Sequence, residues 1–277
     1  MANQEEKIGG YTRQEIDALH RHLYRILDDI VAVCDKLGIK YFLIGGSAMG
    51  AHFEGEILPW DDDIDIGMER ADYNRFVSEA QEHLPSDLFV QSPYSEARTP
   101  HYFTKVRLNG SIFEDSFELD LPIHHGIFVD VFPLDVVPSC SFIERLHRLK
   151  TRILTNVFAA KNGGRYAKLS SRIIYGFLSL FAPRFLLKWA LKVVPSAFNT
   201  SCSSDKKSCR LNIISQPRDH IKFATVNPPQ VVKFGAGKYK APHDLEGYLN
   251  HHYRNLRPTL PREEWVNHYP VRLQFPE

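Results

Sequence analysis

Two aspartates at alternate positions are the first residues of this sequence that could do chemistry. Asp63 and Asp65 alternate with Ile64 and Ile66 in a stretch expected to form a strand. Because successive side chains of a strand point to opposite faces, the two carboxylates share one face and the isoleucines can anchor the other in a core. Two carboxylates on one face repel each other unless a proton or a cation neutralises them. A divalent metal is the expected neutraliser, and hard oxygen ligands suit Mg²⁺ or Mn²⁺.

A third acid, Asp130, interrupts an apolar stretch at residues 126–135 that is also expected to form a strand. A carboxylate in such a strand is costly without a partner, which favours its convergence on the Asp63 and Asp65 site. The alternative is a solvated strand end next to Pro133. The sequence therefore predicts three carboxylates in one place, or two and a surface acid.

Three carboxylates that hold one or two divalent ions are suited to phosphoryl or nucleotidyl transfer. In such a site Asp130 could hold the metal or accept the proton of an attacking hydroxyl group. Asp62 should face away from this group. Asp61 has the same parity as Asp63, but it lies at the junction with a loop.

Glycines and basic residues could supply the phosphate contacts of this site. The predicted first strand runs into Gly45, Gly46 and Ser47. Glycines let the backbone approach a phosphate closely, and Ser47 would open a helix whose N-terminus favours anions. Lys105 and Arg107 share one face of a predicted strand and could offset the remaining phosphate charge. The alternative is that both are cations on the strand surface.

Capping and turn signals delimit several elements. Thr12 and Glu15 form a capping-box pattern, apolar residues then recur at helical spacing to Leu37, and Gly38 is a good stop. The dipeptide at 109–110, Asn-Gly, predicts a hairpin turn. A final helix is expected to start at 241–244, with Asp244 near its positive end.

The charges of the chain are unevenly distributed. The net charge is +1, but residues 145–204 contain eleven Lys and Arg and neither Asp nor Glu. This asymmetry indicates a basic surface that meets an anionic partner. Within it, Arg184, Lys188 and Lys192 fall on one face of a predicted helix. Residues 142–194 could contact an anionic membrane peripherally, or they could form a helical subdomain with a solvated basic face.

The location of the protein follows from signals near its N-terminus and from its cysteines. Residues 1–7 have neither the basic nor the apolar region of a secretion signal, and four cysteines fit a reduced cytosolic protein. We therefore expect a cytoplasmic protein, or one held peripherally at the inner face of the cell membrane, with no nucleic-acid partner. Cys202 and Cys209 could be half of a metal site, or they could be ordinary free thiols.

Three segments resemble the LicD family. The run Pro-Trp-Asp-Asp-Asp-Ile-Asp at 59–65, with the Gly-Gly-Ser turn at 45–47, looks like the family signature. Residues 125–135 are similar to a second family motif, and residues 238–253 resemble its C-terminal segment more loosely. The resemblance implies an α+β nucleotidyltransferase fold of the DNA polymerase beta superfamily, with a mixed sheet flanked by helices.

For the domain organisation, the resemblance suggests one catalytic domain over residues 1–277. Its parts are expected to be an N-terminal helix (12–38), a nucleotidyltransferase core (39–138), a helical basic insertion (141–215) and a C-terminal segment (216–277). The basic insertion departs from the common family pattern. So does Arg254-Asn255, where the family usually has Gly-Asp. Both departures lie where acceptor contacts are expected, so the resemblance does not identify the acceptor.

For the activity, the resemblance implies Mg²⁺-dependent transfer of phosphocholine or an alditol phosphate from a CDP-linked donor. The acceptor would be a hydroxyl group of a cell-surface glycan, such as lipopolysaccharide or teichoic acid, or of its lipid-linked precursor. By motif matching, Asp63, Asp65 and Asp130 are the expected metal ligands and catalytic acids. The alternative enzyme would move NMP from an NTP onto a small acceptor. A non-catalytic module that binds anions or membranes is a third interpretation, but such a module has no need of clustered acids.

Overall fold

The computed structural model describes residues 7–166, 168–202, 209–213, 220–253, 256–258 and 260–277. Its helices are α1 (Arg13–Leu37), α2 (Gly45–Phe53), α3 (Arg70–Glu79), α4 (Ser141–Lys161), α5 (Leu169–Leu180), α6 (Arg184–Val193), α7 (Phe223–Val226) and α8 (Leu245–His252). Its strands are β1 (Phe42–Leu43), β2 (Asp65–Glu69), β3 (Leu88–Gln91), β4 (Thr104–Leu108), β5 (Ile112–Glu114), β6 (Phe128–Val136), β7 (Arg210–Ile213), β8 (Ile221–Lys222), β9 (Gln230–Phe234), β10 (Gly237–Ala241) and β11 (Arg272–Gln274).

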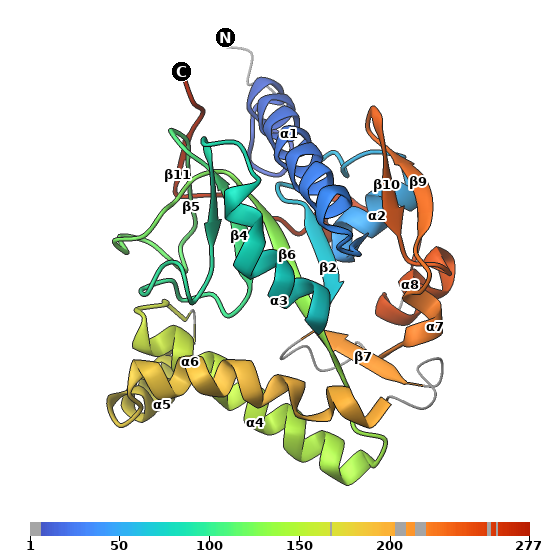
Figure 1. Cartoon of the computed structure of the whole chain (residues 1–277). Coiled ribbons are helices and arrows are strands. Elements are labelled where there is room, and N and C mark those ends of the chain that lie inside the picture. Colours follow the sequence, from blue (N-terminus) through green and yellow to red (C-terminus); the bar gives the residue numbers. More distant parts are fainter. Residues whose placement is uncertain (1–6, 167, 203–208, 214–219, 254–255, 259) are drawn as a thin grey trace.

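A mixed sheet forms the centre of the fold. Its strand order is β1-β2-β6-β4-β3, and β7 extends it by pairing with the far end of β6 and with β8. β2 and β6 are parallel, whereas the other pairs of this sheet are antiparallel. Helices α1 and α3 lie along one face of the sheet, and both contact β6 (Figure 1). The predicted α+β class and the mixed sheet flanked by helices are therefore confirmed.

Helix α1 forms as its capping pattern predicts. The Thr12 hydroxyl accepts a hydrogen bond from the Glu15 backbone N–H, and the Glu15 carboxylate accepts one from the Thr12 backbone N–H. Gly38 caps the C-terminus in the left-handed conformation. The buried side of α1 carries Leu19, Leu23 and other apolar residues into the main core.

Two local predictions about turns and caps were wrong in detail. The Asn-Gly turn at 109–110 does not join a β4–β5 hairpin, because β3 and β6 occupy both edges of β4. β5 instead pairs with β11 near the C-terminus. The last helix, α8, starts at Leu245 rather than at 241, and Asp244 is its N-cap with the carboxylate accepting from the Gly247 N–H. A turn signal specifies a chain reversal, and it does not choose the partner strand.

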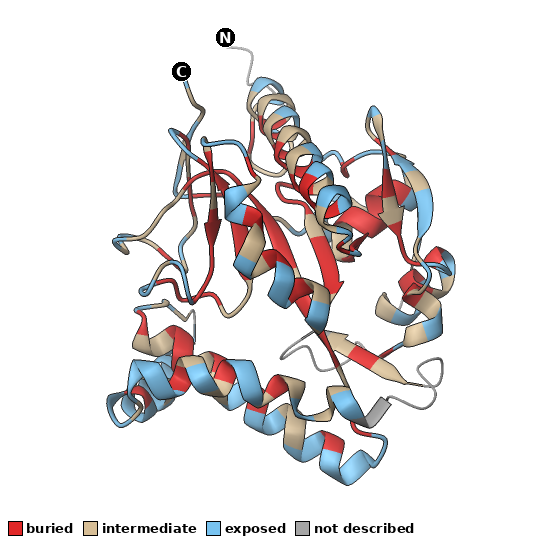
Figure 2. Cartoon of the chain, in the orientation of Figure 1, coloured by how far each residue is buried: buried red, intermediate tan, exposed pale blue. Residues whose placement is uncertain are grey.

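Helices α4, α5 and α6 form a layer beside the sheet (Figure 1). Val157, Phe158, Leu187 and Leu191 make a small hydrophobic cluster between α4 and α6, separate from the main core. Much of the remaining surface of these helices is exposed (Figure 2). Over the described residues, no helix combines the length and the hydropathy that crossing a bilayer requires. The division of the chain into the four predicted parts stays a prediction.

The cysteines differ from the expectation of reduced thiols at one position. Cys34 and Cys140 are free, as expected, but Cys209 is disulfide-bonded. The side chain of Cys202 lies outside the described residues, as do Arg254 and Asn255.

Candidate active site

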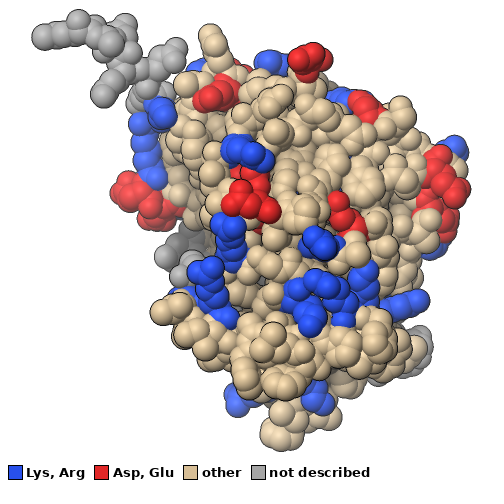
Figure 3. All heavy atoms as spheres, turned by 90° about the vertical axis from the view of Figure 1, so that its left-hand side faces the viewer, with Lys and Arg blue, Asp and Glu red and all other residues tan. Residues whose placement is uncertain are grey.

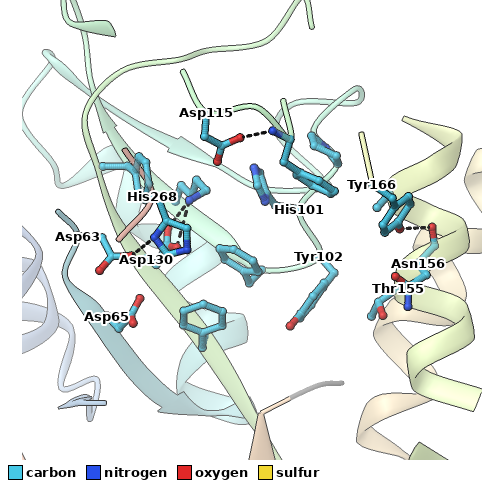
Figure 4. A pocket seen from close by; sticks show the side chains of 17 residues that line it. Asp63, Asp65, His101, Tyr102, Asp115, Asp130, Thr155, Asn156, Tyr166 and His268 are labelled. Atoms are coloured by element: carbon cyan, nitrogen blue, oxygen red, sulfur yellow. Dashed lines mark hydrogen bonds and ion pairs between the residues drawn. The ribbon is translucent and has the colours of Figure 1, made fainter. Parts of the chain in front are cut away.

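Three carboxylates converge where β2 and β6 run side by side. Asp65, the first residue of β2, lies directly opposite Asp130 in the parallel β2–β6 pair. Asp63 lies in the segment that leads into β2, so the regular strand begins two residues later than expected. Carboxylate oxygens of Asp63, Asp65 and Asp130 all lie within 4.8 Å of one another (Figure 4). The predicted convergence of the three acids is therefore present in the structure.

Burial and mutual repulsion make two of these carboxylates, those of Asp65 and Asp130, hard to ionise. Burial raises the pKa of Asp65 well above its usual range, and the charges of Asp63 and Asp130 raise it further. Burial also raises the pKa of Asp130 to about 6, with Asp63 adding to the rise and Lys105 opposing it. Asp65 and Asp130 therefore favour a proton or a cation nearby. A cluster of hard oxygen donors with this demand fits a divalent ion such as Mg²⁺ or Mn²⁺.

Lys105 is the cation that the fold places beside this cluster. It lies opposite Asp130 in the antiparallel β4–β6 pair. Its ammonium group donates to both Asp130 oxygens at 2.9 and 3.1 Å, and it stands 3.3 Å from the centre of the Phe128 ring. Lys105 is buried and lines the same cavity as the three acids. One positive charge cannot neutralise three carboxylates, so the group needs a proton or further positive charge.

Arg107, unlike Lys105, does not contact the three-acid cluster. Its buried guanidinium donates to both carboxylate oxygens of Glu118, to the Gln91 side chain and to the Gly126 carbonyl group. Although burial opposes it, Arg107 lowers the pKa of Glu118, and a hydrogen bond from His101 lowers it further. Arg107 is absent from the described residues that line the cavity. Its position fits a structural role better than the predicted contact with substrate.

The Gly-Gly-Ser turn supports the acidic segment. α2 begins at Gly45, two residues before the expected start at Ser47. A Cβ atom on Gly46 would lie 2.5 Å from a carboxylate oxygen of Asp61, so any larger residue would require the Asp61 side chain to move. The Ser47 hydroxyl accepts from the Asp65 backbone N–H at 2.8 Å, and the Gly45 N–H donates to the Tyr248 hydroxyl. These contacts hold carboxylates in place, while the predicted phosphate contact of the turn stays a prediction.

Asp61 and Asp62 do not belong to the three-acid group. Burial, with the charges of Asp63 and Asp62, raises the pKa of Asp61 well above its usual range. The buried Asp62 carboxylate accepts from the Tyr11 hydroxyl at 2.7 Å and from the backbone N–H of His268 at 2.9 Å. Asp62 therefore ties the N-terminal and C-terminal segments to the site.

A cavity of about 460 Å³ opens beside the carboxylates. Asp63, Asp65 and Asp130 stand on one side, and α4 closes the other (Figure 4). The α4 residues in the wall are Thr155, Asn156 and Ala159. Six aromatic side chains account for much of the rest of the lining: Tyr102, Phe103, Phe117, Phe128, Phe132 and Tyr166. The cavity thus combines an acidic end with largely aromatic walls.

His268 is a site residue that the sequence did not reveal. Its ring Nδ1 lies 3.4 Å from an Asp63 oxygen, and contacts with Asp62 and Asp63 raise the pKa of this histidine. The tail that carries it is held by the stacking of Trp265 on Trp60, with ring centres 4.6 Å apart. The Pro-rich tail has no periodic pattern, so only the fold brings His268 to the acids. Asp115 and His101 also line the cavity, and the sequence did not reveal them because only the fold brings them to its wall.

In comparisons with known proteins, part of the chain matches one family. The model described as "LicD/FKTN/FKRP, nucleotidyltransferase domain" matches residues 38–148, which include all three acids. Lipopolysaccharide cholinephosphotransferase LicD of Haemophilus influenzae is 45% identical over 122 residues, which cover 41% of this chain and 42% of the relative.

Two human proteins are also similar. Ribitol-5-phosphate transferase FKTN is 25% identical over 175 residues, which cover 63% of this chain and 29% of the relative. Ribitol 5-phosphate transferase FKRP is 46% identical over 39 residues, or 14% of this chain and 8% of the relative. The chain therefore spans less than half the length of these relatives.

Proposed function

Residues 38–148 form a domain of the LicD family, and from this premise we propose that the protein is a phosphotransferase. The proposed reaction moves a phospho-alcohol from a CDP-linked donor to a hydroxyl group of a cell-surface glycan or its lipid-linked precursor. We also propose the nucleotidyltransferase fold of the DNA polymerase beta superfamily and action at the inner face of the cell membrane. The observation that carries the reaction class is the convergence of Asp63, Asp65 and Asp130 at one end of the cavity.

The acidic cluster would hold Mg²⁺, with Mn²⁺ as a substitute, through Asp63, Asp65 and Asp130. When bound, the ion would offset the charge of the donor's phosphates and polarise the phosphorus under attack. The protein's own groups have complementary tasks. Lys105 keeps Asp130 oriented through both carboxylate oxygens. The cavity walls would hold the donor in line with the attacking hydroxyl group and exclude water.

In the proposed transfer, the oxygen of the acceptor hydroxyl group forms a bond to the phosphorus that carries the alcohol. The bond between this phosphorus and the oxygen of the CMP moiety breaks, and CMP leaves with the electron pair. The proton of the attacking hydroxyl group passes to a carboxylate of the cluster. Asp130 is suited to receive it where it does not itself bind the ion, since its raised pKa of about 6 then allows a proton to be accepted near neutral pH.

The lining of the cavity favours phosphocholine over an alditol phosphate as the transferred group. A quaternary ammonium is attracted to aromatic faces and to negative charge. The walls offer six aromatic side chains, and Asp115 adds a carboxylate beside Phe117. A polyol would use the hydrogen-bonding side chains that the same walls carry, Thr155 and Asn156 among them, so the preference for phosphocholine rests on the aromatic faces and on Asp115. A relative that is 45% identical over 122 residues is named as a cholinephosphotransferase, in agreement with this choice.

The proposal is tested by incubating the purified protein and Mg²⁺ with CDP-choline, CDP-ribitol or CDP-glycerol and measuring CMP. We expect CMP release to be fastest with CDP-choline and to require the metal. Asp63→Asn should abolish release, while Asp17→Asn on the exposed side of α1 serves as a matched control. Pyrophosphate release from an NTP, with no CMP from any CDP-alcohol, would instead identify the nucleotidyl-transfer alternative.

A further inference from the structure

Helix α5 presents its apolar side to the solvent. Leu169, Ile173, Phe177 and Phe181 follow one another at intervals of four residues along one side of the helix, and they are between 60% and 73% exposed. Ser179, by contrast, is buried. In a helix that only covers a protein core the apolar side faces inward. The orientation of α5 therefore leaves a continuous apolar stripe without a partner in the described part of the chain.

The two neighbouring helices carry similar stripes. In α4 the exposed apolar residues recur at helical spacing. In α6 Trp189 is one of four exposed apolar residues. These residues are Phe142, Leu146, Leu149 and Ile153 of α4, and Phe185, Leu186, Trp189 and Val193 of α6. α4 meanwhile buries Thr151 and Thr155. We call the exposed stripes of α4, α5 and α6 together the apolar face.

The charge around the apolar face has one sign. Exposed Lys and Arg side chains accompany all three helices, and residues 145–204 contain no Asp or Glu. Figure 3 shows Lys and Arg but no acidic side chain over the lower part of its view, where these helices lie. The exposed basic residues are Arg145, Lys150, Arg152, Arg165, Lys168, Arg172, Arg184 and Lys192.

We infer that the apolar face is a docking surface for an anionic lipid bilayer. Aromatic and aliphatic side chains of the three helices enter the boundary between headgroups and acyl chains, and the surrounding basic groups meet the anionic headgroups. This differs from docking through the basic side of α6 alone. Arg184 at the start of that side remains exposed but donates to the Asn162 side chain and the Lys161 carbonyl group, so part of its hydrogen-bonding capacity is used within the protein.

A lipid surface fits this face better than a second copy of the chain. A symmetric dimer places the same patch of both copies in contact, so the basic groups would repel each other around the contact. An anionic bilayer offers apolar volume and opposite charge together. The long side chains of Lys and Arg can also extend from the edge of the apolar face toward headgroups.

Docking in this way would bring the active-site cavity close to the lipid. α4 carries part of the apolar face on one side and the cavity residues Thr155, Asn156 and Ala159 on another. An acceptor with a lipid anchor could then remain in the bilayer while its glycan enters the cavity. This last step rests on the proposed function, whereas the binding to vesicles does not.

The test is sedimentation of the full chain with vesicles of phosphatidylcholine, alone or mixed with phosphatidylglycerol, without any nucleotide. We expect strong binding only to the mixed vesicles, with a blue shift of the Trp189 emission that is absent in Trp189→Phe. The double variant Phe177→Ser/Phe181→Ser should lose about tenfold or more in apparent affinity. Val231→Ser/Val266→Ser, at exposed valines outside the face, is the matched control and should bind as the natural chain does.

Charge reversal tests the contribution of the basic side chains to membrane binding. Lys168→Glu/Arg172→Glu should weaken binding to anionic vesicles by roughly tenfold or more, and added salt should weaken the natural chain similarly. Equal binding to both vesicle types, or unchanged binding of the Phe177 and Phe181 variant, would overturn the inference. So would a dimer in solution that this variant dissociates. CMP release from a soluble donor, measured without vesicles, reports separately on the proposed activity.

Discussion

Lys105 and Asp130 form a buried ion pair in which one ammonium group contacts both carboxylate oxygens, at 2.9 and 3.1 Å. The two residues face each other across β4 and β6, so the sheet register itself makes the pair. Asp130 thereby keeps a fixed orientation beside Asp63 and Asp65.

Lys105→Met should destabilise the protein strongly. Removing one partner of a buried pair leaves an uncompensated charge, which typically costs about 3–5 kcal/mol of the free energy of unfolding. Denaturant unfolding measures this loss. The double variant Lys105→Met/Asp130→Asn should lose less than the sum of the two single changes, since no charge is left unpaired. Strict additivity would show that the two side chains do not interact.

Asp65→Asn should reduce the affinity for Mg²⁺ by about two orders of magnitude or more, because a charged oxygen ligand is replaced by a neutral amide. Isothermal titration calorimetry with Mg²⁺ and with Mn²⁺ checks this. Asp120→Asn, at an exposed carboxylate that pairs with Arg165 on the surface, is a suitable control. If both variants bind the ion equally well, the metal site lies elsewhere.

Without a metal, the protein should become less stable as the pH rises from about 4 to about 6. In this window Asp130 keeps its proton in the folded state, where its pKa is about 6, but loses it in the unfolded state. The folded state binds more protons there, so raising the pH favours unfolding. Unfolding in EDTA measures the slope.

Two comparisons check that the slope comes from the acidic cluster. Asp130→Asn should flatten the pH dependence, because its amide does not titrate. Mg²⁺ should stabilise the natural chain more at pH 8 than at pH 5, since the ion competes with protons for the same oxygens. A slope that persists unchanged in Asp130→Asn would assign it to other groups.

His268→Gln should increase the affinity for Mg²⁺ by a few-fold at neutral pH. The ring lies 3.4 Å from Asp63, and the acids around it hold its proton, so its positive charge opposes the approach of a cation. The effect is modest because the side chain is largely exposed. Titration calorimetry compares it with His243→Gln, at a surface histidine away from the site. A fall in affinity would instead make His268 a metal ligand.

Gly46→Ala should lower the free energy of unfolding by about 1–3 kcal/mol, because the new methyl group meets the Asp61 carboxylate at 2.5 Å. The same change at Gly176 in α5 is the matched control, since a Cβ atom there has no neighbour within 4 Å. Thermal unfolding distinguishes the two. Equal stability of both variants would mean that Asp61 moves aside freely.

Short-range sequence patterns were sufficient to predict part of this structure. The alternation of Asp63 and Asp65 with isoleucines, the Thr12–Glu15 capping box and the apolar period of α1 depend on residues a few positions apart, and the structure has all three. Local sterics and hydrogen bonds determine such features. The sequence also isolated Asp130, since a carboxylate within an apolar strand requires a partner.

Contacts between distant segments were decided only by the tertiary structure. The register of β2 on β6 sets Asp65 opposite Asp130, and Lys105 reaches the pair only because β4 lies on the other side of β6. His268 arrives through a tail whose sequence has no period. The apolar spacing in α5 fits a helix in either orientation, with these side chains toward the core or toward the solvent. Only packing of the whole chain decides which side of a helix faces the core, because burial is a property of the assembled fold and not of the segment.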